Sequence, residues 1–307
     1  MLSLGLTGGI AAGKSLLAAR FRELGAVLID ADQLARDVVA PGTPGLGAVV
    51  QHFGAGVLLP DGSLDRPKLG AIVFGDAAAR EALNGIVHPL VRAAAHDVKA
   101  GAGSGSIVVQ DIPLLVETGQ GANFHFVVVV QASEETRLAR MMRDRGMSET
   151  DARARLAAQA TDAERAAAAD VLIINDGTPE EALAELDELW HTRLLPFAAN
   201  LAAGVPAARA AADPTSHGRE WQAQPARIMA RLARAAGDAA SSIGEAGAVE
   251  LPGEPTGSIL EIRLKDATNP STVLPGLAEA GFFAVPGSVP VLLRSADPGL
   301  AVSVQLR

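Results

Sequence analysis

The residues with the clearest chemical meaning are Gly8-Gly9-Ile10-Ala11-Ala12-Gly13-Lys14-Ser15. They match the phosphate-binding P-loop pattern G-x-x-x-x-G-K-[ST], between an apolar run and an amphipathic stretch. Glycines let the backbone curl so that several N–H groups face phosphate oxygens at the positive end of the next helix. Lys14 is expected to neutralise the β- and γ-phosphates, and the Ser15 hydroxyl to bind Mg²⁺. The predicted ATP-binding residues of this loop are Gly9, Ile10, Ala11, Ala12, Gly13, Lys14, Ser15 and Leu16.

Two carboxylates, Asp30 and Asp32, follow the second apolar run of the chain. In extended backbone, residues two apart point the same way, so both would leave the sheet on one face. A carboxylate there can accept a proton from a substrate hydroxyl or hold a Mg²⁺-bound water. An aspartate before Gln33-Leu34 can also cap a helix. We expect one of the two to cap and favour Asp32 for the chemistry.

Three further polar residues lie at predicted strand ends or on a helix. Asp111 ends a run of the Walker B form, and either Mg²⁺ binding through water or capping of the next turn is open to it. Asn175 follows the last strand, where it could contact an adenine or simply form a turn. Arg140 is favoured as a phosphate ligand, whereas the neighbouring arginines are predicted to form a solvated, ion-paired helix face.

Histidine gives little additional signal. His88, before Pro89, is predicted to end an apolar helix as a packed or capping residue, and the other histidines show no metal-ligand spacing.

The elements that must position these residues alternate between short apolar runs and longer helical patterns. Such alternation predicts a doubly wound parallel α/β sheet. The predicted strands are Leu2–Leu6, Ala26–Ile29, Ser106–Gln110, His125–Gln131 and Val171–Ile174. The predicted helices are Lys14–Leu24, Ser133–Arg145, Ser148–Gln159, Asp162–Ala169 and Pro179–Leu195, with Ser133 and Thr178 as N-caps.

Two regions fall outside this alternation. The interval from Asp32 to Gly105 is too long for a loop and predicts an inserted helical subdomain with a turn at Asp61-Gly62. Residues 199–218 are rich in Ala, Pro and Gly and read as a linker. The remaining 219–307 predicts a small α+β appendage with a helix at Gln222–Ala236, one strand at Ile259–Leu264 and a helix near Val273–Ala280.

Composition narrows the classes of function. The 307 residues carry a net charge of −9, which disfavours generic nucleic-acid or anionic-membrane binding. The absence of cysteine excludes thiolate catalysis and Cys-ligated metals. Aromatic residues make up only 3%, too few for base-stacking platforms. With no targeting signal or long apolar run, a soluble cytoplasmic protein is expected, as a monomer or weak homo-oligomer without nucleic-acid or membrane partners.

Read in order, several segments resemble the dephospho-CoA kinase family. The matching stretches are Leu6-Thr7-Gly8-Gly9-Ile10 with Gly13-Lys14-Ser15, Ile29-Asp30-Ala31-Asp32 with Ala35-Arg36, Leu83-Asn84-Gly85-Ile86-Val87-His88-Pro89, Asp111-Ile112-Pro113-Leu114-Leu115-Val116-Glu117, Arg145-Gly146-Met147 and Ala157-Ala158-Gln159-Ala160. The resemblance implies a P-loop NTPase-type parallel sheet flanked by helices, within a kinase domain over 1–198. It implies phosphorylation of the ribose 3′-hydroxyl of dephospho-CoA by ATP and Mg²⁺, giving coenzyme A and ADP.

The resemblance also implies roles for individual residues. Asp32 would be the catalytic acid/base, Lys14 the phosphate-binding lysine and Arg140 the phosphate clamp. The helical insertion, about 33–104, would bind the acceptor, with His88 and Leu114 among the substrate contacts, and 143–160 would form a lid.

Two departures concern the P-loop, and a further resemblance concerns the tail. Leu16 stands where many relatives have Thr, which removes one hydroxyl contact to the α-phosphate, and Ala11 and Ala12 stand where Gly is common, which asks more of the loop backbone. From about Asp213 the chain resembles the start of a GrpB-like domain, so 219–307 is interpreted as a shortened, non-catalytic version of it.

Two other classes compete with this interpretation. Another P-loop small-molecule kinase, of the nucleotide or shikimate type, would share the loop, the sheet and the lid but lack the Asp111–Glu117 and His88-Pro89 segments. A GTPase-like switch needs an N-K-x-D motif and a D-x-x-G, and neither follows the appropriate strands.

Overall fold

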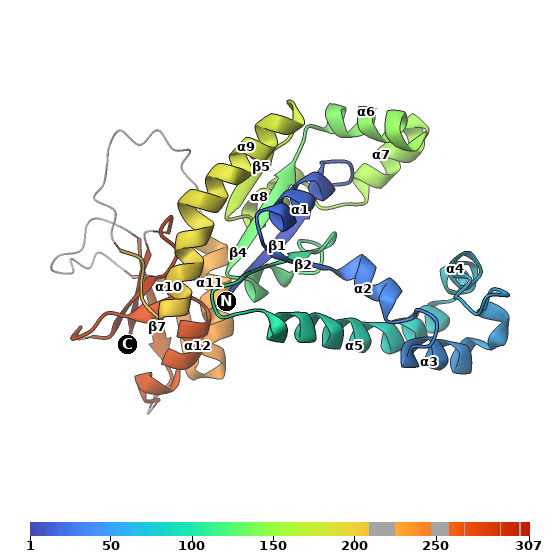
Figure 1. The fold of residues 1–307 in the computed structure, drawn as a ribbon. Helices are drawn as coiled ribbons and strands as arrows, with labels where there is room; N and C mark the ends of the chain where they lie inside the picture. The colour runs from blue at the N-terminus through green and yellow to red at the C-terminus, as the bar shows by residue number, and fades with distance from the viewer. Residues whose placement is uncertain (209–224, 247–257, 267, 289, 301) are drawn as a thin grey trace. The chain divides into compact units, whose positions relative to one another are not determined.

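The computed structural model describes residues 1–208, 225–246, 258–266, 268–288, 290–300 and 302–307. The chain divides into two compact units, one made of Met1–Ala26 with Ser104–Arg307 and the other of Val27–Gly103. The first unit holds the P-loop, a parallel sheet and the C-terminal region, and the second is mostly helical (Figure 1).

A parallel sheet forms the centre of the first unit. Its strands β1 (Leu2–Gly8), β3 (Ile107–Asp111), β4 (Phe126–Gln131) and β5 (Val171–Ile174) run in the order β3-β1-β4-β5. β1 is buried along its whole length, as expected for a strand covered on both faces. The fifth strand of the sheet is β2 (Val27–Asp30), so the predicted parallel α/β sheet is confirmed.

The helices of the first unit begin where the sequence predicts. They are α1 (Lys14–Glu23), α6 (Glu134–Arg145), α7 (Glu149–Ala157), α8 (Asp162–Ala168) and α9 (Pro179–Leu189). The Ser133 hydroxyl accepts a hydrogen bond from the Thr136 amide at 3.2 Å, and Thr178 forms a capping box with Glu181. Both predicted N-caps are therefore confirmed.

The last helix of the parallel-sheet region is longer than predicted. A single π-turn, η3 (Trp190–Leu194), joins α9 to α10 (Leu195–Ala203), and Figure 1 shows them as one extended helical run. α10 therefore overlaps the predicted linker, because Phe197 and Ala198 are buried and hold the chain helical. Residues 209–218 of that linker lie outside the described residues.

The second unit confirms the predicted helical insertion. Its helices are α2 (Ala31–Asp37), α3 (Pro44–Phe53), α4 (Arg66–Gly75) and α5 (Ala77–Gly101), with a short 3₁₀ turn η1 (Ala55–Val57). A bridge between Leu58 and Leu64 closes the predicted turn at Asp61-Gly62. Within the described ranges, none of the protein's helices combines the length and apolar character needed to cross a membrane.

The predicted helix end at His88-Pro89 is wrong. α5 continues through Pro89 and is 25 residues long. A proline removes one N–H donor and strains one turn, but the alanine-rich segments on both sides favour the helix strongly enough to span it.

A second sheet forms the C-terminal part of the first unit. Strands β6 (Ala240–Glu245), β7 (Ser258–Leu264), β8 (Phe282–Ala284), β9 (Leu292–Ser295) and β10 (Val302–Leu306) pair in the order β6-β7-β10-β9-β8. Helices α11 (Pro225–Ala236) and α12 (Leu274–Glu279) accompany them, with the 3₁₀ turns η4 (Gly237–Ala239) and η5 (Pro270–Thr272). The sequence predicts one of these strands, because runs of three to six residues carry little periodicity. The predicted α+β class is confirmed.

Buried ion pairs join this region to the parallel sheet. The Nε and Nη2 atoms of Arg193 in η3 donate to the two oxygens of Asp297, both at 2.8 Å. Arg227 of α11 donates from Nε to Asp170 at 2.7 Å, and the same carboxylate accepts the Val127 amide at 2.7 Å. All four charged side chains are almost fully buried, so removal of one partner would leave an uncompensated charge in the interior.

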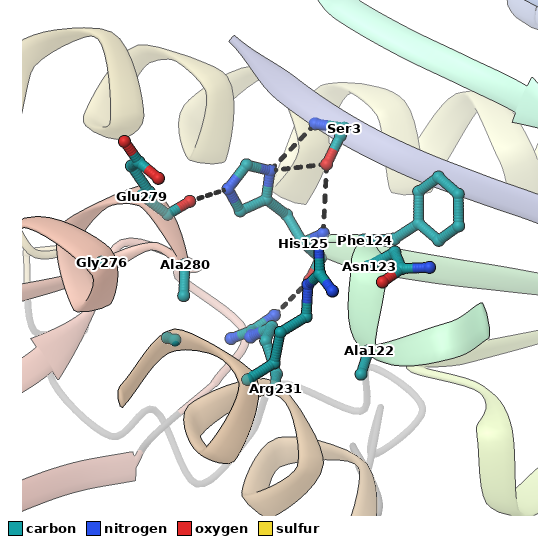
Figure 2. Close-up of a pocket in the computed structure, with 11 residues that line it drawn as sticks. Ser3, Ala122, Asn123, Phe124, His125, Arg231, Gly276, Glu279 and Ala280 are labelled. Carbon is teal, nitrogen blue, oxygen red and sulfur yellow. Dashed lines mark hydrogen bonds between the residues drawn. The ribbon is translucent and has the colours of Figure 1, made fainter. Parts of the chain in front are cut away.

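His125 forms a third connection at this junction (Figure 2). The Ser3 amide donates to Nδ1 at 3.0 Å, which places the ring proton on Nε2, and Nε2 donates to the Glu279 carbonyl at 2.5 Å. Burial lowers the pKa of His125 to about 4, with smaller contributions from the positive charges of Arg231, the N-terminal ammonium and Arg227. The imidazole is therefore neutral at pH 7.

This arrangement predicts acid sensitivity. Because the pKa of His125 is lower in the folded than in the unfolded protein, protons favour unfolding between about pH 6.5 and pH 4. We expect the free energy of unfolding to fall by roughly 2–3 kcal/mol over this range through His125 alone. Urea titrations at several pH values should show a shallower pH dependence for His125→Asn than for the wild type. The exposed His52→Asn is the control, and an unchanged profile for His125→Asn would contradict the assignment.

Candidate active site

The P-loop occupies the turn from the carboxyl end of β1 to α1. Two backbone hydrogen bonds between residues three apart stabilise its turn. They run from the Ala12 amide to the Gly9 carbonyl and from the Leu16 amide to the Gly13 carbonyl, both at 3.0 Å. Gly13 has φ +100° and Ala11 has φ +60°. Ala11 therefore adopts the left-handed backbone conformation, which costs energy for a residue with a Cβ atom. This confirms the expectation that alanine strains the loop backbone here.

Two side chains hold the outside of the loop through its carbonyl groups. Arg140 of α6 donates from Nη1 to the Ala11 carbonyl at 3.3 Å and from Nη2 to the Asn175 carbonyl at 2.9 Å. The Asn175 side-chain amide donates to the Ala12 carbonyl at 2.7 Å. A Cβ atom on Gly13 would lie 2.0 Å from the Asn175 amide nitrogen, so only glycine fits there. Arg140 and Asn175 thus meet at the P-loop, although Asn175 acts here on the loop backbone.

Lys14 and Asp111 form an ion pair beside the loop. Lys14 is the first residue of α1, and Asp111 is the last residue of β3, which pairs with β1 at Leu6. The Asp111 carboxylate is buried, and the ammonium group of Lys14 lies against it. This contact is neither a metal ligation nor a turn cap, the two alternatives that the sequence leaves open for Asp111, and no local pattern predicts it.

Two arginines of this site were missed. Arg137 and Arg165 are both buried and share one oxygen of Asp162, at 3.2 Å and 2.6 Å. A Cβ atom on Gly9 would lie 2.5 Å from Nη1 of Arg137 and 3.4 Å from the guanidinium carbon of Arg165. The solvated-face interpretation is therefore wrong for Arg137. It holds for Arg153, an exposed residue that pairs with Glu134 and Glu149.

A signal for these arginines is weak in the sequence. Arg137 lies one helical turn before the apolar Met141, which predicts the same buried face, but nothing local distinguishes Arg165. Two guanidinium groups against one half-exposed carboxylate leave positive charge beside Gly9. Such charge favours a phosphate at the loop.

The segment after α7 also reaches the loop. The Gln159 side-chain oxygen accepts the Ile10 amide at 2.8 Å, and Glu117 accepts the Ala160 amide at 3.0 Å. Leu114, in the same segment as Glu117, is half-exposed. The Asp111–Glu117 and Ala157–Ala160 segments, far apart in sequence, therefore contact each other at this site.

Asp30, Asp32 and His88 belong to the second unit. The Asp30 carboxylate accepts the Gln33 amide at 2.9 Å and caps α2, as expected for one of the pair. Asp32 is exposed in the first turn of that helix. The expectation of extended geometry for both is wrong, because the helix starts at Ala31. His88 is exposed on α5.

Known proteins resemble this chain in sequence over the region that contains the site. The family model described as dephospho-CoA kinase matches residues 2–181. The dephospho-CoA kinase of Mycolicibacterium paratuberculosis is 49% identical over 259 residues, which cover 83% of this chain and 62% of that protein. The dephospho-CoA kinase of Streptomyces avermitilis is 55% identical over 190 residues, 62% of this chain and 93% of that protein.

A solved structure shares the fold of the same region. The crystal structure of TT1252 from Thermus thermophilus superposes with a TM-score of 0.53 at 30% identity, covering 62% of this chain and 96% of that one. The chain spans 62% of the length of the Mycolicibacterium relative, less than two thirds of it.

The strained loop residue gives a paired prediction. Ala11→Gly should stabilise the protein by about 0.5–1 kcal/mol, because glycine adopts the left-handed conformation without strain. Part of this gain is offset, since glycine also increases the conformational entropy of the unfolded chain. Ala12→Gly, at a buried position without positive φ, should destabilise it by about 1 kcal/mol. Urea unfolding of both variants measures the difference, and equal losses of stability would rule out strain at Ala11.

Proposed function

Because the chain belongs to the dephospho-CoA kinase family, we propose that it transfers the γ-phosphoryl group of ATP to the ribose 3′-hydroxyl of dephospho-CoA. In this reaction the 3′-oxygen forms a bond to the γ-phosphorus, and the bond to the β–γ bridging oxygen breaks. ADP leaves with that oxygen, and the hydroxyl proton passes to a general base. The products are coenzyme A and ADP.

The observation that carries the proposal is the shape of the P-loop. Arg140 and Asn175 donate to the carbonyls of Ala11 and Ala12, so both acceptors are satisfied by side chains from outside the loop sequence. A loop with its carbonyls held outward can direct amide donors toward a phosphate at the start of α1. Lys14 follows directly and supplies a positive charge for the β- and γ-phosphates. This arrangement supports ATP as the phosphoryl donor.

The assigned roles of the neighbouring cations follow from their contacts. Arg140 is proposed as the phosphate clamp, which acts next to the phosphates while its guanidinium fixes the loop. Arg137 and Arg165 are positioning residues, because they lie against Gly9 and add positive charge under the loop. Their pairing with Asp162 keeps both guanidinium planes fixed.

The residues that would hold Mg²⁺ are Ser15 and Asp111. Mg²⁺ commonly takes one or two protein oxygens and completes its shell with water and substrate phosphates. The buried Asp111 carboxylate already lies against the ammonium group of Lys14, so this position suits a cation. When bound, Mg²⁺ would neutralise charge on the β- and γ-phosphates.

The acceptor side of the proposal rests on the helical unit and on the 143–160 segment. Asp32 is exposed at the first turn of α2 and is proposed as the base, and His88 and Leu114 are proposed to contact dephospho-CoA. Residues 143–160 are proposed as a lid that excludes water. The hydrogen bonds of Gln159 with the Ile10 amide and of the Ala160 amide with Glu117 link the final residues of this segment to the nucleotide loop, which supports that role.

The direct test is ADP release with ATP, Mg²⁺ and one acceptor at a time. Dephospho-CoA, adenosine, AMP, shikimate and no acceptor form the panel. We expect turnover with dephospho-CoA alone. Turnover with AMP or shikimate would favour another P-loop kinase, and the absence of turnover with every acceptor would reject the proposal.

A matched pair of variants tests the base. Asp32→Asn should lower kcat by about 10²–10⁴-fold, because asparagine cannot accept the hydroxyl proton, while the Kd for ADP stays unchanged. Asp30→Asn is the control, since asparagine caps a helix as well as aspartate does and activity should persist. Steady-state kinetics and calorimetric ADP binding measure both effects. Near-wild-type kcat in Asp32→Asn would show that another residue is the base.

A further inference from the structure

A cavity of about 460 Å³ lies in the first unit, at the amino ends of the parallel strands (Figure 2). Ser3 of β1 lines it together with Phe124 and His125, which precede β4, and Arg231, Arg234 and Glu279 line it from α11 and α12. Its volume falls in the range of small-molecule sites. Ser3 and Gly9 are separated by the length of β1, about 20 Å, so this cavity is distinct from the P-loop.

Among the residues that the structure describes, three buried arginines at this junction face two buried carboxylates. Arg193 and Arg227 each use the edge formed by Nε and Nη2 to bind a carboxylate, Asp297 and Asp170 respectively. The same edge of Arg231 has no hydrogen-bond partner among the described residues. Its Nη1 donates to the His125 carbonyl, and its guanidinium lies over the Phe282 ring at 4.8 Å. Among the described residues of this junction, Arg231 is thus the arginine whose Nε–Nη2 edge is buried without a hydrogen-bond partner.

No described carboxylate is hydrogen-bonded to Arg231, although the charges of Asp170 and Asp297 partly favour its charged form. Burial and the nearby Arg227 lower the pKa of Arg231 to about 10, so the side chain is still charged at pH 7. His125 is neutral there and both of its ring nitrogens are hydrogen-bonded. Arg234 and Glu279 at the cavity wall are exposed and of opposite charge. One buried positive charge therefore remains, at a considerable cost in solvation.

We propose that this cavity binds a small organic anion, whose carboxylate or phosphate group pairs with the Nε–Nη2 edge of Arg231. Planar guanidinium edges match two oxygens of such groups, as the Arg193–Asp297 pair shows in the same junction. The Nε and Nη2 atoms are buried in a side chain that lines the cavity, so the proposed binding requires the guanidinium to turn toward the cavity when the anion enters. The bound anion supplies the missing third negative charge and stabilises the junction.

The proposal is tested by anion-dependent thermal stability of the whole chain. The probes are inorganic phosphate and malonate, compared with chloride at equal ionic strength, in the presence of saturating ADP to occupy the P-loop. A site that binds only the folded state raises Tm by about 2–4 °C at tenfold excess over Kd. Phosphate also stabilises proteins by exclusion from their surface, but that effect does not saturate. We expect a saturable rise with at least one probe, and the probe that acts identifies the anionic group.

Two variants of Arg231 separate binding from a structural role. Arg231→Met keeps the stem over Phe282 and removes the unpaired charge, so its Tm without added anion should equal or exceed that of the wild type, while the saturable rise disappears. Arg231→Lys keeps a charge without the planar edge and should weaken binding several-fold. The exposed Arg22→Gln on α1 is the control and should keep the full response.

Two results would overturn the proposal. One is a wild-type protein whose Tm responds to phosphate and malonate only as it does to chloride. The other is a saturable rise that persists in Arg231→Met, which would locate the anion elsewhere, including at the P-loop. Neither result depends on phosphoryl transfer, so the kinase proposal and the anion site fail separately.

Discussion

The turn between β1 and α1 depends on how its carbonyl groups are satisfied. A loop that directs amide donors inward must direct carbonyls outward, and buried carbonyls need donors. Arg140 and Asn175 provide those donors for Ala11 and Ala12, from α6 and from the end of β5. The parallel sheet sets these positions, because the ends of β1 and β5 meet at one edge. Packing in the sheet thereby fixes the shape of a site whose own residues are mostly small.

Charge is arranged around this loop in pairs. Lys14 lies against Asp111, and Arg137 and Arg165 share Asp162, so a carboxylate holds each of these three cations in place, whereas Arg140 is held by backbone carbonyls. Exposed pairs of this kind contribute little stability, but buried ones fix geometry. The C-terminal junction repeats the pattern with Arg193 and Arg227. Arg231 differs from these two arginines, because no described carboxylate is hydrogen-bonded to it. The cavity that it lines is for that reason the candidate anion site.

The sequence predicts the parallel strands, the helix caps at Ser133 and Thr178, and the P-loop, because each of these depends on a local residue pattern. It also predicts Arg140 and Asn175 as candidate site residues, because Arg140 lies on a helix expected near the loop and Asn175 follows the last strand. It does not reach Arg165, whose importance comes from a fold that brings residues 9 and 165 together. The start of α2 at Ala31, which changes the geometry of Asp32, depends on an Asp30 cap that local sequence allows but does not require. The short strands β8 and β9 are fixed by pairing rather than by their own pattern.

The proposed function implies that a nucleotide phosphate takes the place of Asp111 beside Lys14, and that the Asp111 carboxylate then contacts Mg²⁺. Calorimetric binding of ADP to wild type and Asp111→Asn, with and without Mg²⁺, tests it most directly. Without Mg²⁺ the variant should bind ADP at least as tightly as wild type, because its Lys14 has no competing carboxylate. With Mg²⁺ the wild type should gain affinity and the variant should not. Equal weakening of ADP binding in Asp111→Asn under both conditions would contradict the account.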